Sequence, residues 1–206
     1  MSVPEGAERA SDSDTDYGNI RKTFATRDLP RHLALFYRSQ SEQLTVASAF
    51  VADGLARDER CLYLADQNDP RDVREAFERH GIDVDGRKAD GQLDLVDAAQ
   101  VYTDGAFDPS AAIAQLETRA RGSVEEGYTG FRVAGENTWS FDVEDAFESV
   151  IDFEIRFGDT CTDLPVTALC QYDVEKFDDA VLGKVLQTHE RVTSSTALRP
   201  WHPATG

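Results

Sequence analysis

Short apolar runs alternate along this chain with longer segments whose apolar residues recur at helical spacing. The runs of strand length are 32–37, 61–65, 93–96, 129–134 and 166–172. The segments with apolar residues every three or four positions are 44–55, 70–80, 108–121, 142–157 and 177–193. A strand followed by a helix, five times over, indicates βα crossover units. The pattern therefore predicts an α/β fold with three layers, in which helices cover both faces of a mostly parallel sheet.

Local signals mark the ends of two of these helices. Pro70 suits the first turn of a helix, and Gly81 stands where a helix commonly ends. Asp108 followed by Pro109 supplies an N-cap and a first-turn proline for the next helix. Functional residues in such a fold are expected just past the carboxyl ends of the strands, where ligands of open α/β sheets bind.

The two ends of the chain differ from this pattern. Residues 1–28 are rich in Ser, Asp, Glu, Gly and Thr, with few large apolar groups, and predict a disordered acidic tail. Residues 193–206 mix Ser, Thr and Pro around Trp201 and predict a second tail. One domain over 29–192 is therefore expected.

Acidic residues dominate the charge of the chain. Asp and Glu number 39 against 21 Lys and Arg, which gives a formal net charge of −18. Such a charge repels nucleic-acid phosphates and anionic membranes, so neither is an expected partner. We interpret the spread of Asp along the chain as adaptation to a halophilic, high-salt cytosol; an acidic docking face is the alternative.

The cysteines and the hydropathy fit a cytoplasmic protein. The three cysteines have no CxxC spacing, so the sequence predicts neither a disulfide framework nor a metal site. No apolar run approaches the roughly 18 residues of a membrane span, and the N-terminus lacks the character of a signal peptide.

A nucleotide-binding loop is missing from the first strand–helix connection. A P-loop needs glycines to wrap the phosphates and a lysine to neutralise them, yet residues 37–43 read Tyr-Arg-Ser-Gln-Ser-Glu-Gln. P-loop ATP hydrolysis is therefore excluded, and no other common enzyme signature is present. We expect a non-catalytic protein without a cofactor; an enzyme of an unrecognised type is a third interpretation.

Aromatic and acidic residues gather at the predicted carboxyl edge of the sheet. An edge of this composition suits a pocket for a small organic ligand. The candidate ligand-binding residues are Tyr37, Asp66, Glu136, Trp139 and Tyr172. The alternative for Asp66 is that it only caps a turn. The string Gly135-Glu-Asn-Thr-Trp139 is the most unusual of these features, and site and scaffold remain equal interpretations of it.

Other polar residues favour structural roles. His32 begins its strand at the edge opposite the expected pocket, so hydrogen bonding is favoured over catalysis. Glu154 lies near the apolar face of its helix and is either a buried, paired carboxylate or a boundary residue. Cys170, inside the last strand, is expected to act as a small core residue. His189 is expected on the surface at a helix end.

Several strings of this chain together resemble the MEDS family, the methanogen/methylotroph DcmR sensory domain. They include residues 32–37, 50–55, 59–63, 127–133, 135–139, the Phe153-Glu154 pair and 169–172. The resemblance implies a RecA/KaiC-like fold without a functional P-loop, in a sensor of small organic molecules or a signalling module. Family members occur alone or beside helix-turn-helix segments or histidine kinases. The positions that match the family are His32, Tyr37, Glu136, Trp139, Glu154, Cys170 and Tyr172.

Two functional hypotheses follow. In the first, a small organic ligand binds at the carboxyl edge, and the domain then regulates a separate histidine kinase or transcription regulator. In the second, the domain is a ligand-free platform for protein–protein interaction, with a second copy of itself among its partners. An open crevice between Tyr37, Glu136 and Trp139 would favour the first, and side chains filling that space would favour the second.

Overall fold

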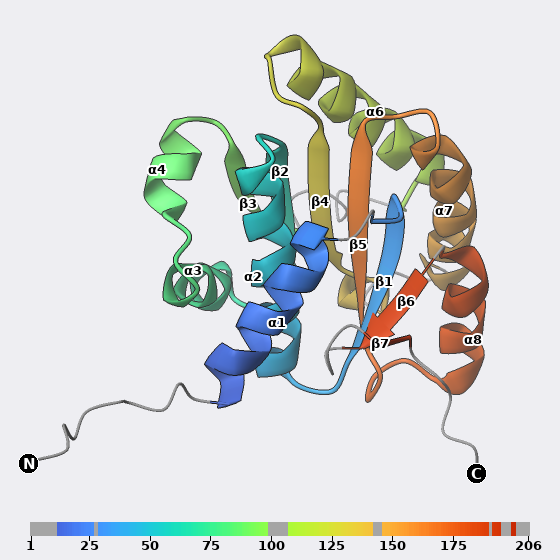
Figure 1. The fold of residues 1–206 in the computed structure, drawn as a ribbon. Helices are drawn as coiled ribbons and strands as arrows, with labels where there is room; N and C mark the ends of the chain where they lie inside the picture. Colours follow the sequence, from blue (N-terminus) through green and yellow to red (C-terminus); the bar gives the residue numbers. More distant parts are fainter. Residues whose placement is uncertain are drawn as a thin grey trace, which may run out of the picture.

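A seven-stranded sheet forms the centre of the molecule in the computed structural model, which describes residues 12–26, 29–98, 107–141, 146–189, 191–194 and 199–200 (Figure 1). The strand order is β3-β2-β4-β5-β1-β6-β7, and all neighbours pair in parallel except β6 and β7. The strands are β1 (His32–Tyr37), β2 (Arg60–Ala65), β3 (Leu93–Asp97), β4 (Phe131–Glu136), β5 (Val166–Asp173), β6 (Arg191–Ser194) and β7 (Arg199–Pro200).

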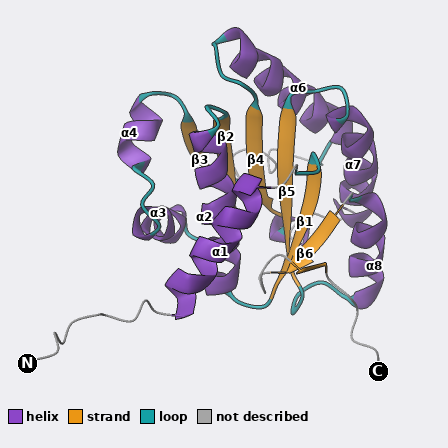
Figure 2. Ribbon diagram, viewed as in Figure 1, coloured by secondary structure: helices purple, strands orange, loops and turns teal. Residues whose placement is uncertain are grey.

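Helices cover both faces of this sheet (Figure 2). They are α1 (Asp12–Thr26), α2 (Gln40–Ala56), α3 (Pro70–Arg79), α4 (Val84–Ala89), α6 (Pro109–Glu125), α7 (Ala146–Cys161), α8 (Asp179–Thr188) and the 3-10 helix η1 (Thr138–Phe141). The core against α1, α2 and α3 contains Leu33, Leu35 and Leu169, whereas α6, α7 and α8 pack against alternate residues of the same strands. The three-layer α/β fold and its mostly parallel sheet are thus confirmed.

The predicted helix ends are also confirmed. Asp108 accepts hydrogen bonds from the backbone N–H groups of Ser110 and Ala111, with Pro109 in the first turn of α6. Gly81 follows α3 with a φ of 81°, a left-handed conformation that glycine adopts without strain. Both signals depend only on residues that are adjacent in the chain, so they can be recognised from the sequence alone.

The prediction of a disordered tail over 1–28 is wrong for residues 12–26, which form α1. Ile20 and Phe24 are each only 1% exposed, and the Phe24 ring meets Phe50 of α2 edge-on at 5.7 Å. Two apolar residues four positions apart give this polar segment one face to bury, and the contact with α2 stabilises the helix. Residues 1–11 and 27–28 lie outside the described residues.

The C-terminal tail predicted over 193–206 also requires correction. The last helix ends at Thr188, and β6 pairs in parallel with β1, with Leu33 opposite Arg191. β7 continues the sheet beside β6. Trp201 lies outside the described residues. β6 adds hydrogen bonds to the open edge of β1, and it forms although its own sequence contains few apolar residues.

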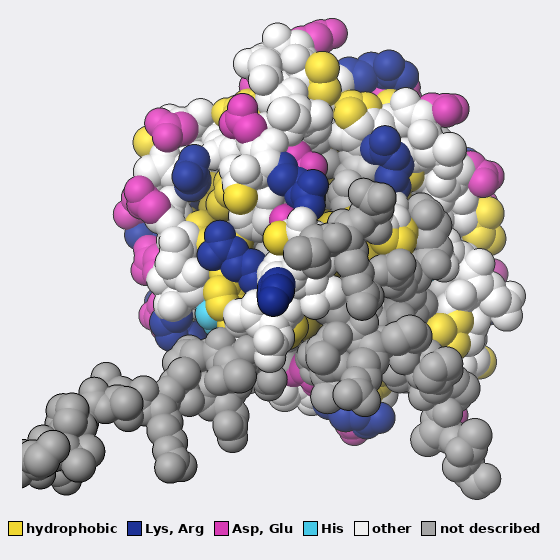
Figure 3. Space-filling view, viewed as in Figure 1, with side chains coloured by type: hydrophobic (Ala, Val, Ile, Leu, Met, Phe, Trp, Pro, Cys, Tyr) yellow, Lys and Arg dark blue, Asp and Glu magenta, His cyan; other side chains and the backbone are white. Residues whose placement is uncertain are grey.

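Basic and acidic side chains are unevenly placed on the face that carries α1. In Figure 3, Lys and Arg lie over the middle of this face, and most of the visible Asp and Glu lie toward its outline. No helix in the described part of the chain is long and apolar enough to cross a membrane.

Candidate functional site

The turn between β1 and α2, where a P-loop would lie, is closed by its own side chains. Ser39 caps α2 by accepting a hydrogen bond from the Glu42 N–H at 3.3 Å. The Glu42 carboxylate accepts a 2.7 Å hydrogen bond from the Arg38 N–H. An acidic group therefore occupies the helix start that would otherwise attract a phosphate, in agreement with the missing glycines and lysine.

Glu136 is buried at the carboxyl edge, at the end of β4, with an exposed fraction of 0%. One of its oxygens accepts hydrogen bonds from Tyr63 Oη and Asn68 Nδ2, each at 2.7 Å. The other accepts from the N–H groups of Asp66 and Asn68, at 2.9 and 3.0 Å. With two donors on each oxygen, Glu136 holds the loop after β2 against the end of β4. We call Glu136 and its donors Tyr63, Asp66 and Asn68 the latch.

The predicted crevice is filled on this side of the sheet. Tyr37 is buried and donates to Gln67 Oε1 at 3.3 Å. Asp66 accepts a hydrogen bond from the Thr138 hydroxyl. The three predicted residues Tyr37, Asp66 and Glu136 do lie at one edge, but the side chains of the chain itself occupy their polar atoms.

Trp139 and Tyr172, predicted to join them, lie on the opposite face of the sheet. Trp139 is 4% exposed and packs in the core with Phe107, at 4.7 Å between ring centroids. Tyr172 packs edge-on against Phe36 and Phe177. Because Trp139 and Tyr172 pack on the opposite face of the sheet from Tyr37, the five candidates cannot line one pocket.

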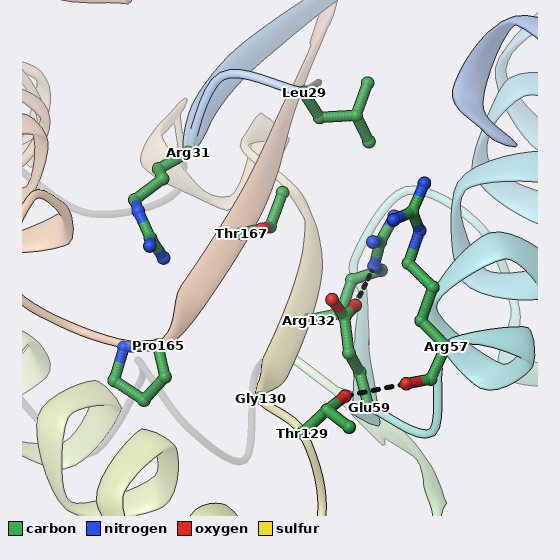
Figure 4. Close-up of a pocket in the computed structure, with 9 residues that line it drawn as sticks. All are labelled: Leu29, Arg31, Arg57, Glu59, Thr129, Gly130, Arg132, Pro165 and Thr167. Carbon is green, nitrogen blue, oxygen red and sulfur yellow. Dashed lines mark hydrogen bonds and ion pairs between the residues drawn. The ribbon is translucent and has the colours of Figure 1, made fainter. Parts of the chain in front are cut away.

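A cavity of about 340 Å³ lies at the other edge of the sheet, at the amino ends of β1, β4 and β5 (Figure 4). Figure 4 shows Arg31 on one side, Arg57 and Arg132 on the other, and Thr167 of β5 between them. The remaining lining residues are Leu29, Glu59, Thr129, Gly130 and Pro165. Three arginines in one cavity stand out in a chain whose net charge is −18. We call this cavity the amino-edge pocket.

Arg132 is the buried cation of the amino-edge pocket, with 2% of the residue exposed. Its Nε donates to Glu59 at 2.5 Å, and its Nη1 lies 3.2 Å from Asp53 and donates to the Phe50 carbonyl at 3.1 Å. The guanidinium also lies over the Phe50 ring, 4.6 Å from its centroid. Gly54 makes this approach possible, since a Cβ there would lie 2.4 Å from Arg132 Cδ.

The amino-edge pocket is joined directly to α1. Arg57 pairs with Asp53 at 2.8 Å and donates through Nη2 to the carbonyls of Phe24 and Ala25, in the last turn of α1. Phe50, beneath Arg132, packs on Phe24. A change in the position of either arginine would therefore alter the contacts that hold α1.

A second polar cluster is buried between the sheet and helices α7 and α8. Glu154 of α7, 0% exposed, is at its centre. Its Oε1 accepts from Tyr172 Oη at 2.5 Å and Asn137 Nδ2 at 3.3 Å. Its Oε2 lies 2.9 Å from His32 Nε2, and Cys170 Sγ lies 3.6 Å from both of these atoms. We call Glu154, His32, Cys170 and His189 the buried cluster.

His189 completes the buried cluster, with its Nε2 at 3.5 Å from Glu154 Oε2. Its Nδ1 lies 2.9 Å from the Val185 carbonyl, so Nδ1 carries the proton and donates it there. Burial lowers the pKa of His189 to about 4, against the attraction of Glu154. At neutral pH the ring is therefore uncharged, and the Nε2 lone pair faces the cluster.

The acidic members of the cluster differ in charge. Burial raises the pKa of Glu154, but the neighbouring His189 and the hydrogen bonds from His32 and Tyr172 outweigh it and lower this pKa to about 2. Burial and the Glu154 charge raise the pKa of the Cys170 thiol well above its usual value. The cluster thus contains one carboxylate and one thiol at neutral pH.

Some of these roles agree with the predictions made from the sequence. Glu154 is a buried, paired carboxylate, one of the two alternatives, and the His32 ring makes the structural hydrogen bond expected of it. Cys170 lies in the core, where it was expected, but in contact with polar groups. The prediction that His189 lies on the surface is wrong, because its residue is only 7% exposed. Arg31 and Arg132 were not predicted as site residues.

The chain is similar to known sensory and regulatory proteins. The family model described as "MEthanogen/methylotroph, DcmR Sensory domain", MEDS, matches residues 31–190. The transcriptional repressor DcmR of Methylorubrum extorquens is 22% identical over 160 residues, which make up 77% of this chain and 58% of the repressor. The chain thus matches less than two thirds of that relative's length. The family model spans most of the chain, including the buried cluster and every lining residue of the amino-edge pocket except Leu29. This chain therefore belongs to the MEDS family of sensory domains.

Proposed function

We propose that this chain is a non-catalytic sensory domain that binds a small organic anion in the amino-edge pocket and thereby regulates a transcription regulator. The observation that carries the proposal is the pocket itself, with three arginines around about 340 Å³. A cavity of this volume suits a small molecule. The similarity to a transcriptional repressor supports a regulator, in preference to a histidine kinase, as the partner.

The charges around the pocket favour an anion. Arg57 and Arg132 pair with Asp53 and Glu59, whereas Arg31 donates through Nη1 to the carbonyls of Leu164 and Val166. Three guanidinium groups against two carboxylates leave a net charge of +1. Arg31 has no carboxylate partner among the described residues, so its charge is the one available to a ligand. A carboxylate or phosphate group matches the planar donor geometry of arginine.

The position of the pocket suggests how the signal leaves the domain. Arg57 binds the last carbonyls of α1, and Arg132 lies on Phe50, which packs on Phe24 of α1. A ligand that draws either guanidinium toward itself would weaken or strengthen the docking of α1. We propose that the partner reads this change in α1, which lies outside the part of the chain that matches the family model.

A ligand-free platform is the second candidate, and a specific observation favours it. The carboxyl edge, where the sequence places a ligand, is filled by the latch around Glu136. If the amino-edge pocket also binds nothing, the domain has the character of a docking surface for other proteins.

The experiment is a thermal-shift screen of small organic carboxylates and phosphate esters in molar salt. A ligand present at a hundred times its Kd adds about 2.7 kcal/mol, which for a domain of this size raises Tm by about 5–10 °C. We expect Arg31→Gln to abolish the shift. Arg38 lies exposed at the opposite edge and pairs with Glu175 at 3.0 Å, so Arg38→Gln should leave the shift unchanged.

Two results would count against this proposal. If no anion raises Tm while the protein still binds its regulator, the platform candidate replaces the sensor. If a ligand raises Tm equally in wild type and Arg31→Gln, the domain binds a ligand, but not in the amino-edge pocket.

A further inference from the structure

The buried cluster has a composition that hydrogen bonding alone does not explain. Two imidazoles, one thiol and one carboxylate converge from four separate elements: β1, α7, β5 and the end of α8. Their four nearest ligand atoms all lie within 4.8 Å of one another. We propose that His32, Glu154, Cys170 and His189 bind one divalent transition-metal ion of the zinc class. This site lies on the opposite face of the sheet from the amino-edge pocket and does not depend on it.

The distances between the ligand atoms fit a tetrahedral ion. With metal bonds of zinc length, nitrogen and oxygen ligands lie about 3.3 Å apart, and a sulfur lies about 3.6 Å from either. Cys170 Sγ is 3.6 Å from His32 Nε2 and 3.6 Å from Glu154 Oε2. His189 Nε2 is 3.5 Å from the same Oε2. To admit the ion, the 2.9 Å hydrogen bond between His32 and Glu154 must lengthen by about 0.4 Å. The other pairs of ligand atoms all lie within 4.8 Å, close enough for the ion to draw them together.

Neighbouring groups orient the ligand atoms. The Val185 carbonyl binds His189 Nδ1, which turns the Nε2 lone pair toward the cluster. Tyr172 and Asn137 donate hydrogen bonds to Glu154 Oε1, which leaves Oε2 for the ion. Such outer contacts from carbonyl and hydroxyl groups are typical of the ligands of metal sites. His189 Nε2 has no hydrogen-bond partner among the described residues, and a metal ion would coordinate its buried lone pair.

The charge of the ligand set selects the class of ion. When the ion binds, it displaces the proton of the Cys170 thiol. Two neutral imidazoles, one thiolate and one carboxylate then carry −2, which one divalent cation neutralises completely. A neutral site is the arrangement that a fully buried position tolerates best. The thiolate and imidazoles disfavour magnesium and calcium and favour zinc, cobalt or a similar ion.

A bound ion would join parts of the molecule that are distant in sequence. Four protein ligands leave no open position for a substrate, so the site has the character of a structural centre. His189 lies two positions before Arg191, the first residue of β6, which pairs with β1. The ion would therefore fasten α7 and the end of α8 to the sheet.

The test uses cobalt, because its spectrum reports both thiolate ligation and tetrahedral geometry. Protein stripped with chelator is titrated with Co²⁺ in molar potassium chloride and excess magnesium, which occupies the acidic surface. We expect one equivalent to produce a thiolate-to-cobalt charge-transfer band and strong visible bands, both removed by Zn²⁺. Cys170→Ala should lose the charge-transfer band, while Cys61→Ala, on the opposite face of the sheet, should retain it. His189→Ala should weaken cobalt binding at least tenfold.

Circular dichroism of each variant checks that it is folded. The cobalt titration of the wild-type protein tests the metal site even when a variant with a buried substitution does not fold. Zn²⁺ should raise the Tm of stripped wild type and should not raise that of a folded Cys170→Ala protein. The proposal is overturned if folded wild type shows no charge-transfer band, or if the band persists in Cys170→Ala.

Discussion

Replacing Arg132 with methionine is expected to lower the free energy of unfolding by about 3–5 kcal/mol. Methionine keeps the apolar contact with Phe50 but removes the guanidinium between Asp53 and Glu59. Asp53 is 5% exposed, and burying a carboxylate that has lost a partner is costly. Urea unfolding followed by circular dichroism, at constant salt, measures the loss.

Arg60→Met is the matched control for this substitution. Arg60 lies on the neighbouring strand β2, and it pairs with Glu126 and Asp94, whose side chains are 59% and 39% exposed. Solvent already screens these charges, so the loss should stay below about 1 kcal/mol. Equal losses for the two arginines would show that the buried network around Arg132 does not stabilise the fold.

Glu136→Gln is expected to cost about 3 kcal/mol or more, although it conserves shape. The four hydrogen bonds to Glu136 are all donated to it, two on each oxygen. The amide nitrogen of glutamine would face two donors and leave them unsatisfied inside the protein. In an open crevice, such as the sequence predicts around Glu136, the same substitution would change stability little; the full burial of Glu136 is the reason for the larger effect.

Chemical unfolding also measures the Glu136 effect, with Glu175→Gln as control. The Glu175 side chain is 66% exposed and pairs with Arg38, so its neutralisation should change stability little. If Glu136→Gln were as stable as this control, the latch would have no structural importance, and a ligand-binding role for Glu136 would be favoured again.

Five of the strands could be predicted because each is a short, apolar run that the sheet buries, as the 0% exposure of Leu35, Tyr63 and Leu169 illustrates. The N-cap at Asp108 and the stop at Gly81 were predictable since they depend on adjacent residues. α1 was not, because its sequence is polar apart from a few positions, and tertiary contacts such as that of Phe24 with Phe50 offset the entropy lost when it forms.

The candidate site was harder to predict because it depends on strand register. Tyr172 lies beside Phe36 and Tyr37 beside Asp173, so the two tyrosines point to opposite faces of the sheet. The register between two strands cannot be predicted from a single sequence. Likewise, the four members of the buried cluster are too far apart in the chain for their spacing to indicate a metal site.

Two signals for the missed residues were nevertheless present. Arg132 is a charged residue inside the otherwise apolar run Phe131-Arg-Val-Ala134, and a charge in a buried strand requires partners. His189 follows Leu182 and Val185 at helical spacing, which places it on their buried face. Extending the helical periodicity of α8 from Val185 to His189 would have placed His189 in the core.

Hydrogen exchange, with and without the organic anion found in the thermal-shift screen, tests whether this domain senses an anion in the amino-edge pocket and transmits the signal through α1. We expect ligand binding to alter the exchange of the α1 amides from Tyr17 to Thr26 and to leave exchange at residues 66–69, which contain Asp66 and Asn68 of the latch, unchanged. Saturating ligand that leaves α1 unchanged, or that alters only residues 66–69, would contradict it.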